Sequence, residues 1–169
     1  MNLRPLLAGF AFLTMSLFSS AEPLSVGAAA PAVSSVTETG AAIALADVYA
    51  KQPYTLVYFY PKADTPGCTA QGCSLRDAFE DLTARGVAVI GVSADKPAAQ
   101  KAFKEKYNLP FTLIADHDKK VIEAFGVPTT MGFAKRQAFL IKDGKIVWAD
   151  YAASTRQQAE DVLKAIGAK

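Results

Sequence analysis

Four short apolar runs constrain the fold of this chain more than any other feature of its sequence. They are rich in β-branched and aromatic residues and have no polar break, which is typical of strands buried on both faces of a sheet. The runs are Thr55–Tyr60, Val87–Val92, Phe111–Ala115 and Ala138–Ile141. A fifth strand is predicted at Lys145–Trp148, because the preceding Asp143-Gly144 pair favours a tight β-hairpin turn.

Stretches with helical periodicity separate these strands. The clearest stretch has apolar residues at the i, i+3, i+4, i+7 spacing of one helix face. These residues are Leu75, Ala78, Phe79 and Leu82. Further helices are predicted at Ala98–Tyr107, Lys119–Phe125 and Arg156–Ile166. Alternating strands and helices indicate an α/β domain with parallel pairing. With the closing antiparallel hairpin, this predicts a thioredoxin-like fold, a central mixed sheet flanked by helices.

The chain upstream of the first strong strand carries weaker signals. Glu22–Ala32 is rich in small residues and proline and is expected to form an extended N-terminal extension. Val33–Leu45 alternates weakly around Thr39-Gly40, which indicates a short hairpin. Residues 22–169 are therefore expected to form a single domain that is large enough to bury its own hydrophobic core.

The first 21 residues have the pattern of a secretory signal peptide. Arg4 supplies a positive charge, Leu6–Phe18 is a run of 13 uncharged residues, and residues 19–21 are small. Because about 20 apolar residues are needed to span a bilayer, no membrane association is expected once this segment is cleaved. We expect an exported protein, periplasmic in a bacterium with two membranes and secreted otherwise.

The composition argues against several classes of partner. The chain has 18 Lys and Arg against 16 Asp and Glu, and cleavage would remove only Arg4 from this count. The resulting net charge of +1 gives no electrostatic reason to expect binding to nucleic acid or an anionic membrane. The one histidine, His117, is expected in a solvated turn. Without a set of Cys and His ligands, neither a metal nor a cofactor is expected.

The two cysteines, Cys68 and Cys73, are the residues most informative about function. In an exported chain, an even number of cysteines usually indicates a structural disulfide. Thr65 or Asp64 can cap the helix that begins here, and Pro66 suits its first position, so Cys68 falls in the first turn. There the free backbone N–H groups and the helix dipole favour a thiolate.

The spacing of the cysteines argues against a permanent disulfide. Helical positions i and i+5 have Cα atoms roughly 8 to 9 Å apart, whereas a disulfide requires less than about 7 Å. Cys68 is expected on the apolar side of the helix and Cys73 on the opposite, solvent side. A bridge requires the first turns to unwind, and Gly72 lowers helix stability there by about 1 kcal/mol relative to alanine. This pattern indicates a disulfide that forms and breaks during a reaction cycle.

The segment around the cysteines resembles the active-site motif of peroxiredoxins, P-x-x-x-[T/S]-x-x-C, which is met here by Pro61, Thr65 and Cys68. A second cysteine five residues later is characteristic of the Q-type subfamily, also called bacterioferritin comigratory proteins. The similarity runs from about residue 24 to the C-terminus. It includes IGVSAD at 90–95, KEKYNLPFTLIAD at 104–116 and RQAFLI at 136–141.

The resemblance implies a thiol-dependent peroxidase for hydrogen peroxide and organic hydroperoxides. Cys68 would be the peroxidatic thiolate that becomes a sulfenic acid, and Cys73 the resolving thiol that forms an intramolecular disulfide with it. Thr65 would hold the reacting oxygens, Pro61 would shield the pocket from water, and Arg136 would stabilise the developing negative charge. A thioredoxin-like protein would reduce the disulfide. We expect a monomer, because both thiols belong to one chain.

Two other functions fit the same sequence. A thiol-disulfide oxidoreductase of the thioredoxin type would share the fold and the compartment, but its motif is C-x-x-C, whereas this chain has C-x4-C. An exported, non-enzymatic domain with a structural disulfide is the second alternative. The rate at which the reduced protein consumes peroxide separates all three functions.

Overall fold

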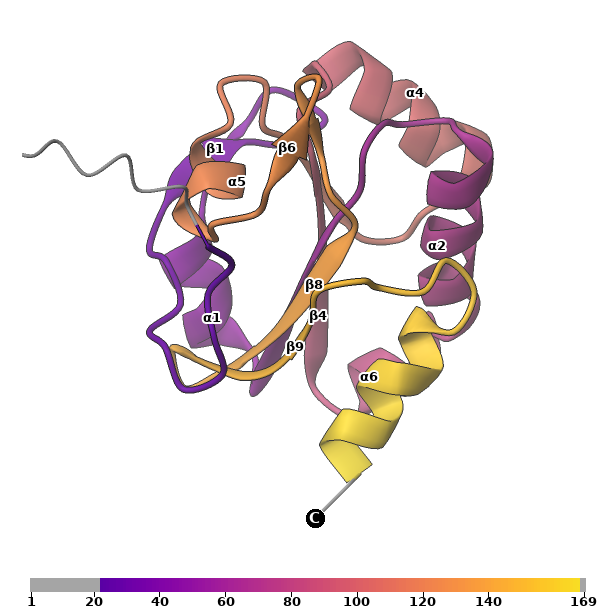
Figure 1. Ribbon diagram of the computed structural model, residues 1–169. Coiled ribbons are helices and arrows are strands. Elements are labelled where there is room, and N and C mark those ends of the chain that lie inside the picture. Colours follow the sequence, from indigo (N-terminus) through magenta and orange to yellow (C-terminus); the bar gives the residue numbers. More distant parts are fainter. Residues whose placement is uncertain (1–21, 168–169) are drawn as a thin grey trace, which may run out of the picture.

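The computed structural model describes residues 22–167, and the signal peptide predicted at residues 1–21 lies outside them. In this range a five-stranded sheet has helices on both faces (Figure 1). Its strands are β3 (Tyr54–Phe59), β4 (Val87–Ser93), β5 (Thr112–Ala115), β8 (Gln137–Lys142) and β9 (Lys145–Asp150). The order is β5-β4-β3-β8-β9, with β3, β4 and β5 parallel and β8 and β9 joined by antiparallel pairing. The five predicted strands are confirmed, with ends that differ by one or two residues.

Helices and two small hairpins complete the described part of the chain. The helices are α1 (Leu45–Lys51), α2 (Pro66–Asp77), α3 (Phe79–Ala84), α4 (Pro97–Tyr107), α5 (Lys120–Ala124) and α6 (Gln158–Gly167). One hairpin pairs β1 (Ser34–Val36) with β2 (Ala42–Ala44), and the other pairs β6 (Thr129–Thr130) with β7 (Phe133–Ala134). The first hairpin was predicted. Neither α1 nor the second hairpin was predicted, because both are too short to show a hydrophobic period.

The apolar stripe from Leu75 to Leu82 predicts one continuous helix, and the structure divides it. Helix α2 ends at Asp77 and α3 begins at Phe79, because Ala78 between them has φ −99° and ψ 11°. Leu75 and Leu82 are both fully buried all the same. The stripe thus identified the buried face correctly, although not the change of direction within it.

Alternate residues of β3 supply two separate hydrophobic cores. Leu56, Tyr58 and Tyr60 belong to the core under α2, α3, α4 and α6. Val57 and Phe59 belong to the core on the opposite face, under α1 and α5. In Figure 1 the sheet lies between these two groups of helices. Since every one of these side chains is fully buried, the unbroken apolar run of β3 follows directly from its central position.

The N-terminal extension lies against the second of these faces. Leu24 N donates to the Phe125 carbonyl at 3.1 Å, and Gly27 N donates to the Ile146 carbonyl at 2.8 Å. Ala30 N donates to the carbonyl of Gly144 at 2.8 Å. The extension is therefore held by backbone hydrogen bonds to the end of α5 and to the β8-β9 hairpin.

Candidate active site

A buried polar network fixes the loop between β3 and α2. Asp95 Oδ2 accepts hydrogen bonds from the backbone N–H of Ala63 at 2.7 Å and from Ser93 Oγ at 2.8 Å. Gln100 of α4 joins the same network, because its Nε2 donates to Ser93 Oγ at 2.9 Å and its Oε1 accepts from the Tyr60 hydroxyl at 2.5 Å. The network holds the loop at the carboxyl ends of β3 and β4, directly before α2.

Cys68 occupies the third position of α2, as predicted. Thr65 is the N-cap and Pro66 the first helical residue, and the Cys68 side chain is only 2% exposed. The Thr65 hydroxyl makes no capping bond and donates instead to the Lys62 carbonyl at 3.0 Å. The N–H groups of the first turn therefore have no side-chain acceptor from the cap, and the positive end of the helix remains available to a thiolate.

Arg136, directly before β8, reaches the Cys68 thiol. Its Nη2 donates to Cys68 Sγ at 3.4 Å, and its Nη1 donates to Gln71 Oε1. A Cβ atom at Gly67 would lie 3.2 Å from Nη2, so a side chain there would press on the guanidinium. The structure thus brings together Cys68 and Arg136, two of the residues predicted for the site.

Two buried glutamines that the sequence analysis missed hold this arginine. Gln71 Nε2 donates to Gln158 Oε1 at 2.6 Å, and both side chains are fully buried. Gln158 is the first residue of α6, so a continuous chain of contacts links Cys68 through Arg136 and Gln71 to the C-terminal helix. Gln71 is a polar residue three positions after Cys68, on the buried side of α2. This pattern could have revealed its role from the sequence.

Cys73 was predicted on the solvent side of the helix, and it is more exposed than Cys68 but not fully exposed. The end of α4 lies close to this part of α2. A Cβ atom at Gly72 would lie 3.4 Å from Leu109, and the Arg76 guanidinium donates to the Tyr107 carbonyl. Both cysteines are free thiols within one helix, so a bridge between them requires that helix to unwind.

Pro61 and Thr65 lie half-buried in the loop that leads into α2. The Thr65 hydroxyl is bonded to the Lys62 carbonyl rather than to Cys68. Beneath α2, burial raises the pKa of Tyr58 well above its usual value, and the neighbouring Tyr60 and Cys68 add to this shift. Tyr58 therefore remains a neutral phenol beside the thiol.

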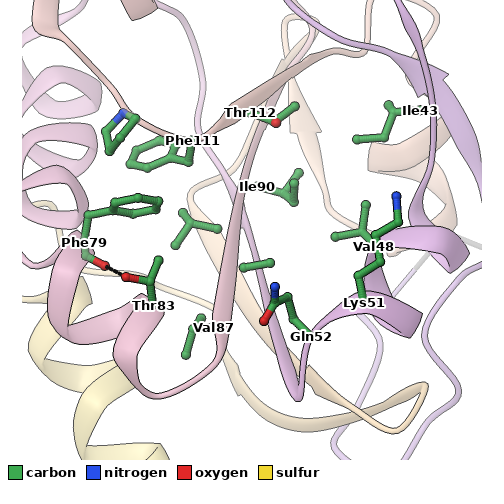
Figure 2. Close-up of a pocket in the computed structure, with 13 residues that line it drawn as sticks. Ile43, Val48, Lys51, Gln52, Phe79, Thr83, Val87, Ile90, Phe111 and Thr112 are labelled. Carbon is green, nitrogen blue, oxygen red and sulfur yellow. Dashed lines mark hydrogen bonds between the residues drawn. The ribbon is translucent and has the colours of Figure 1, made fainter.

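A cavity of about 370 Å³ lies apart from these residues, at the open edge of β4 (Figure 2). Strand β5 pairs only with residues 90–93 of β4. Residues 87–89 of β4 therefore have no partner strand on the β5 side. Phe79 and Phe111 line one side of the cavity and Ile43 the other. None of the residues predicted for the site lines it, so the cavity is not part of the thiol site.

Residues 22–167 offer no cluster of three or more His, Cys, Asp or Glu side chains suited to a metal ion. None of the helices in that range is long and apolar enough to cross a bilayer. His117 is exposed, and its Nδ1 lies 3.2 Å from the Ala94 carbonyl oxygen, as expected for a solvated turn residue.

Residues 26–149 match the model of the AhpC/TSA family. Peroxiredoxin Bcp of Escherichia coli K12 is 44% identical over an alignment 142 residues long, which covers 78% of this chain and 90% of that protein. The chain belongs to the peroxiredoxin family. The chloroplastic peroxiredoxin Q of Oryza sativa subsp. japonica is 39% identical over 126 residues, 73% of this chain and 57% of the rice protein. The resemblance to Q-type peroxiredoxins is confirmed.

Solved structures agree with this assignment. Peroxidoxin BcpB from Mycobacterium tuberculosis superposes with a TM-score of 0.79 at 26% identity, covering 85% of this chain and 96% of that one. PrxQ from Xylella fastidiosa has a TM-score of 0.79 at 25% identity, covering 86% and 96%. The thioredoxin-like fold is confirmed. As a peroxiredoxin, the protein is a thiol-dependent peroxidase, which confirms the main functional prediction over its two alternatives.

Replacement of Gln158 tests whether the buried glutamines position Arg136. We expect Gln158→Leu to slow peroxide consumption about tenfold. This is a smaller loss of rate than removal of a hydrogen-bond donor at the reacting atoms would cause. The reason is that Gln71 loses its acceptor and no longer holds the guanidinium of Arg136. The second-order rate constant with hydrogen peroxide measures the effect, with circular dichroism as a check on folding. Gln157→Leu, at the exposed neighbouring residue, is the control and should match wild type.

Proposed function

We propose that this peroxiredoxin reduces hydrogen peroxide and organic hydroperoxides with Cys68 as the peroxidatic thiol and Cys73 as the resolving thiol. The observation that carries the proposal is a buried thiol in the first turn of α2, 3.4 Å from the Arg136 guanidinium. A relative from Xanthomonas campestris, a bacterioferritin comigratory protein with alkyl peroxide reduction activity, superposes with a TM-score of 0.76 at 27% identity. Its described activity supports a substrate range that includes organic hydroperoxides.

In the first step, the Cys68 thiolate attacks the terminal oxygen of the hydroperoxide. The S–O bond forms as the O–O bond breaks, and the leaving oxygen takes up a proton and departs as water or an alcohol. Negative charge is shared between the two oxygens in the transition state, where fixed donors lower the barrier. Arg136 and the first-turn N–H groups are those donors. Thr65 would exchange its bond to the Lys62 carbonyl for one to the peroxide, while Pro61 excludes water.

In the second step, α2 unwinds and the Cys73 thiolate attacks the sulfur of the Cys68 sulfenic acid. The S–S bond forms, the S–O bond breaks, and the hydroxide takes up a proton and leaves as water. Unwinding also separates Gln71 from Gln158 and Arg136, which are bonded only while the helix is intact. The arrangement that reacts with peroxide and the arrangement that forms the disulfide therefore cannot exist at the same time.

A dithiol protein of the thioredoxin type completes the cycle by reducing the disulfide. We infer that the protein is exported and acts as a monomer, and that its reductant lies in the same compartment. The pattern at residues 1–21 and the presence of both thiols in one chain support this inference.

Addition of substoichiometric hydrogen peroxide to the reduced protein tests the thiol assignments. Wild type should lose two thiols for each peroxide added, within seconds. Cys68→Ser should consume no peroxide beyond the rate of free cysteine, and Cys73→Ser should accumulate a sulfenic acid at Cys68. Thiol counting and mass spectrometry distinguish these products. Rapid consumption by Cys68→Ser would show that a different residue reacts with the peroxide.

Gly72→Ala tests the unwinding step. An added methyl group would lie 3.4 to 3.6 Å from Leu109 and Phe103, which is ordinary van der Waals contact, so alanine fits the folded helix. Because alanine stabilises a helix by about 1 kcal/mol relative to glycine, we expect disulfide formation to slow about fivefold. Over-oxidation of Cys68 at high peroxide should rise correspondingly. An unchanged rate of disulfide formation after a single turnover would refute this role of Gly72.

Export is tested by expressing the full chain in a bacterium with two membranes and fractionating the cells. The protein should appear in the periplasmic fraction with Glu22 as its N-terminal residue, because cleavage is expected after residue 21. A variant that lacks residues 2–21 is the control and should remain in the cytoplasm. Recovery of the full chain in the cytoplasm, with Met1 retained, would contradict the proposal.

A further inference from the structure

The last turn of α2 places an arginine beside Cys73. Arg76 follows Cys73 by three residues, and helical positions three apart are neighbours on one face. Cys73 is partly buried and the Arg76 side chain is 33% exposed, so both lie at the boundary between the protein and solvent. The pKa of Arg76 is raised, chiefly by its hydrogen bond to Asp77 and to a smaller extent by Cys73.

Two neighbours hold the Arg76 guanidinium in position. Its Nη1 donates to the Tyr107 carbonyl at 2.8 Å, and its Nε and Nη2 donate to Asp77 Oδ1 at 2.9 and 2.7 Å. Tyr107 belongs to α4, outside the segment that unwinds. Its hydroxyl also donates to Asp64 at 2.7 Å, just before α2 begins. The anchor at Tyr107 would therefore keep the Arg76 charge in place when the first turns of α2 open.

Each of the two thiols must react as a thiolate at a different step of the proposed cycle. Cys68 has Arg136 and the N-terminus of α2 as its positive groups. Cys73, near the end of the same helix, is far from that terminus and gains nothing from it, because the effect falls off within the first turn. Arg76, three residues later in the same helix, is a cation placed to supply this charge.

We propose that Arg76 is the charge partner of the resolving thiol: it stabilises the Cys73 thiolate and so speeds its attack on the Cys68 sulfenic acid. This inference rests on the proposed roles of the two cysteines. The proton that Cys73 loses passes to solvent, and the hydroxide displaced from Cys68 takes one up and leaves as water. Arg76 remains protonated throughout, and the only oxidant consumed is the sulfenic acid itself.

Asp77 allows the proposal to be tested by a substitution with the opposite expected effect. Its carboxylate lies 2.7 Å from Arg76 Nη2 and offsets part of the positive charge that reaches Cys73. Asp77→Asn should therefore increase the reactivity of Cys73, whereas Arg76→Met should decrease it. A purely structural role for the ion pair would make both substitutions act in the same direction.

The first experiment measures Cys73 alone. In a Cys68→Ser background Cys73 is the only thiol, and its rate of alkylation by iodoacetamide at pH 7 reports the thiolate fraction. Arg76→Met should slow alkylation about fivefold at low ionic strength, as expected for the loss of one nearby charge. Arg76→Lys should restore most of the rate, and the differences should shrink in 1 M KCl. Arg85→Met, at an exposed arginine after α3, is the control and should leave the rate unchanged.

The second experiment uses the protein with both cysteines. After one equivalent of hydrogen peroxide, Arg76→Met should form the sulfenic acid at the wild-type rate but the disulfide about fivefold more slowly. Equal alkylation rates in wild type and Arg76→Met, or an Arg76→Lys variant as slow as Arg76→Met, would overturn the proposal. If no sulfenic acid forms in any variant, the proposed function fails. The alkylation rates decide the role of Arg76 in either case.

Discussion

The contact between the Arg136 guanidinium and the Cys68 thiol is the interaction on which the rest of the site depends. A buried thiolate is unfavourable unless positive groups compensate for the water that it loses. Here the compensation comes from the first turn of α2 and from Arg136, 3.4 Å from the sulfur. The arginine can reach this position because β8 pairs with β3 and because Gln71, which itself donates to Gln158, accepts a hydrogen bond from Nη1 of the guanidinium.

The same helix must satisfy two incompatible demands. In the proposed cycle it must be formed to present Cys68 to peroxide, and it must open to let Cys73 reach Cys68. Its stability is correspondingly limited, since Thr65 makes no capping bond and Gly72 lies between the cysteines. A missing side-chain cap and an internal glycine each cost about 1 kcal/mol. The helix is instead held by tertiary contacts, through Gln71 to α6 and through Arg76 to the end of α4.

Much of this arrangement follows from local patterns. The buried strands were predictable because a central strand excludes polar residues from both of its faces, as β3 shows with its two cores. The position of Cys68 was predictable because Pro66 suits the start of a helix. The break in the helix at Ala78 was not predictable, because the apolar residues on both sides of it follow a single helical period. The partial burial of Cys73 was not predictable either, because it depends on how α2 packs against the rest of the fold.

The sequence by itself determined the fold class, the strands and the helix that carries both thiols, because these depend on the period of apolar residues and on the chemistry of helix ends. Only the tertiary structure decided which groups surround the thiols. Arg136 meets Cys68, Gln158 meets Gln71 and Tyr107 meets Arg76 across 68, 87 and 31 positions of the chain. The family resemblance implied the first of these contacts. The other two arise from the packing of whole elements against one another, and no local pattern of residues records them.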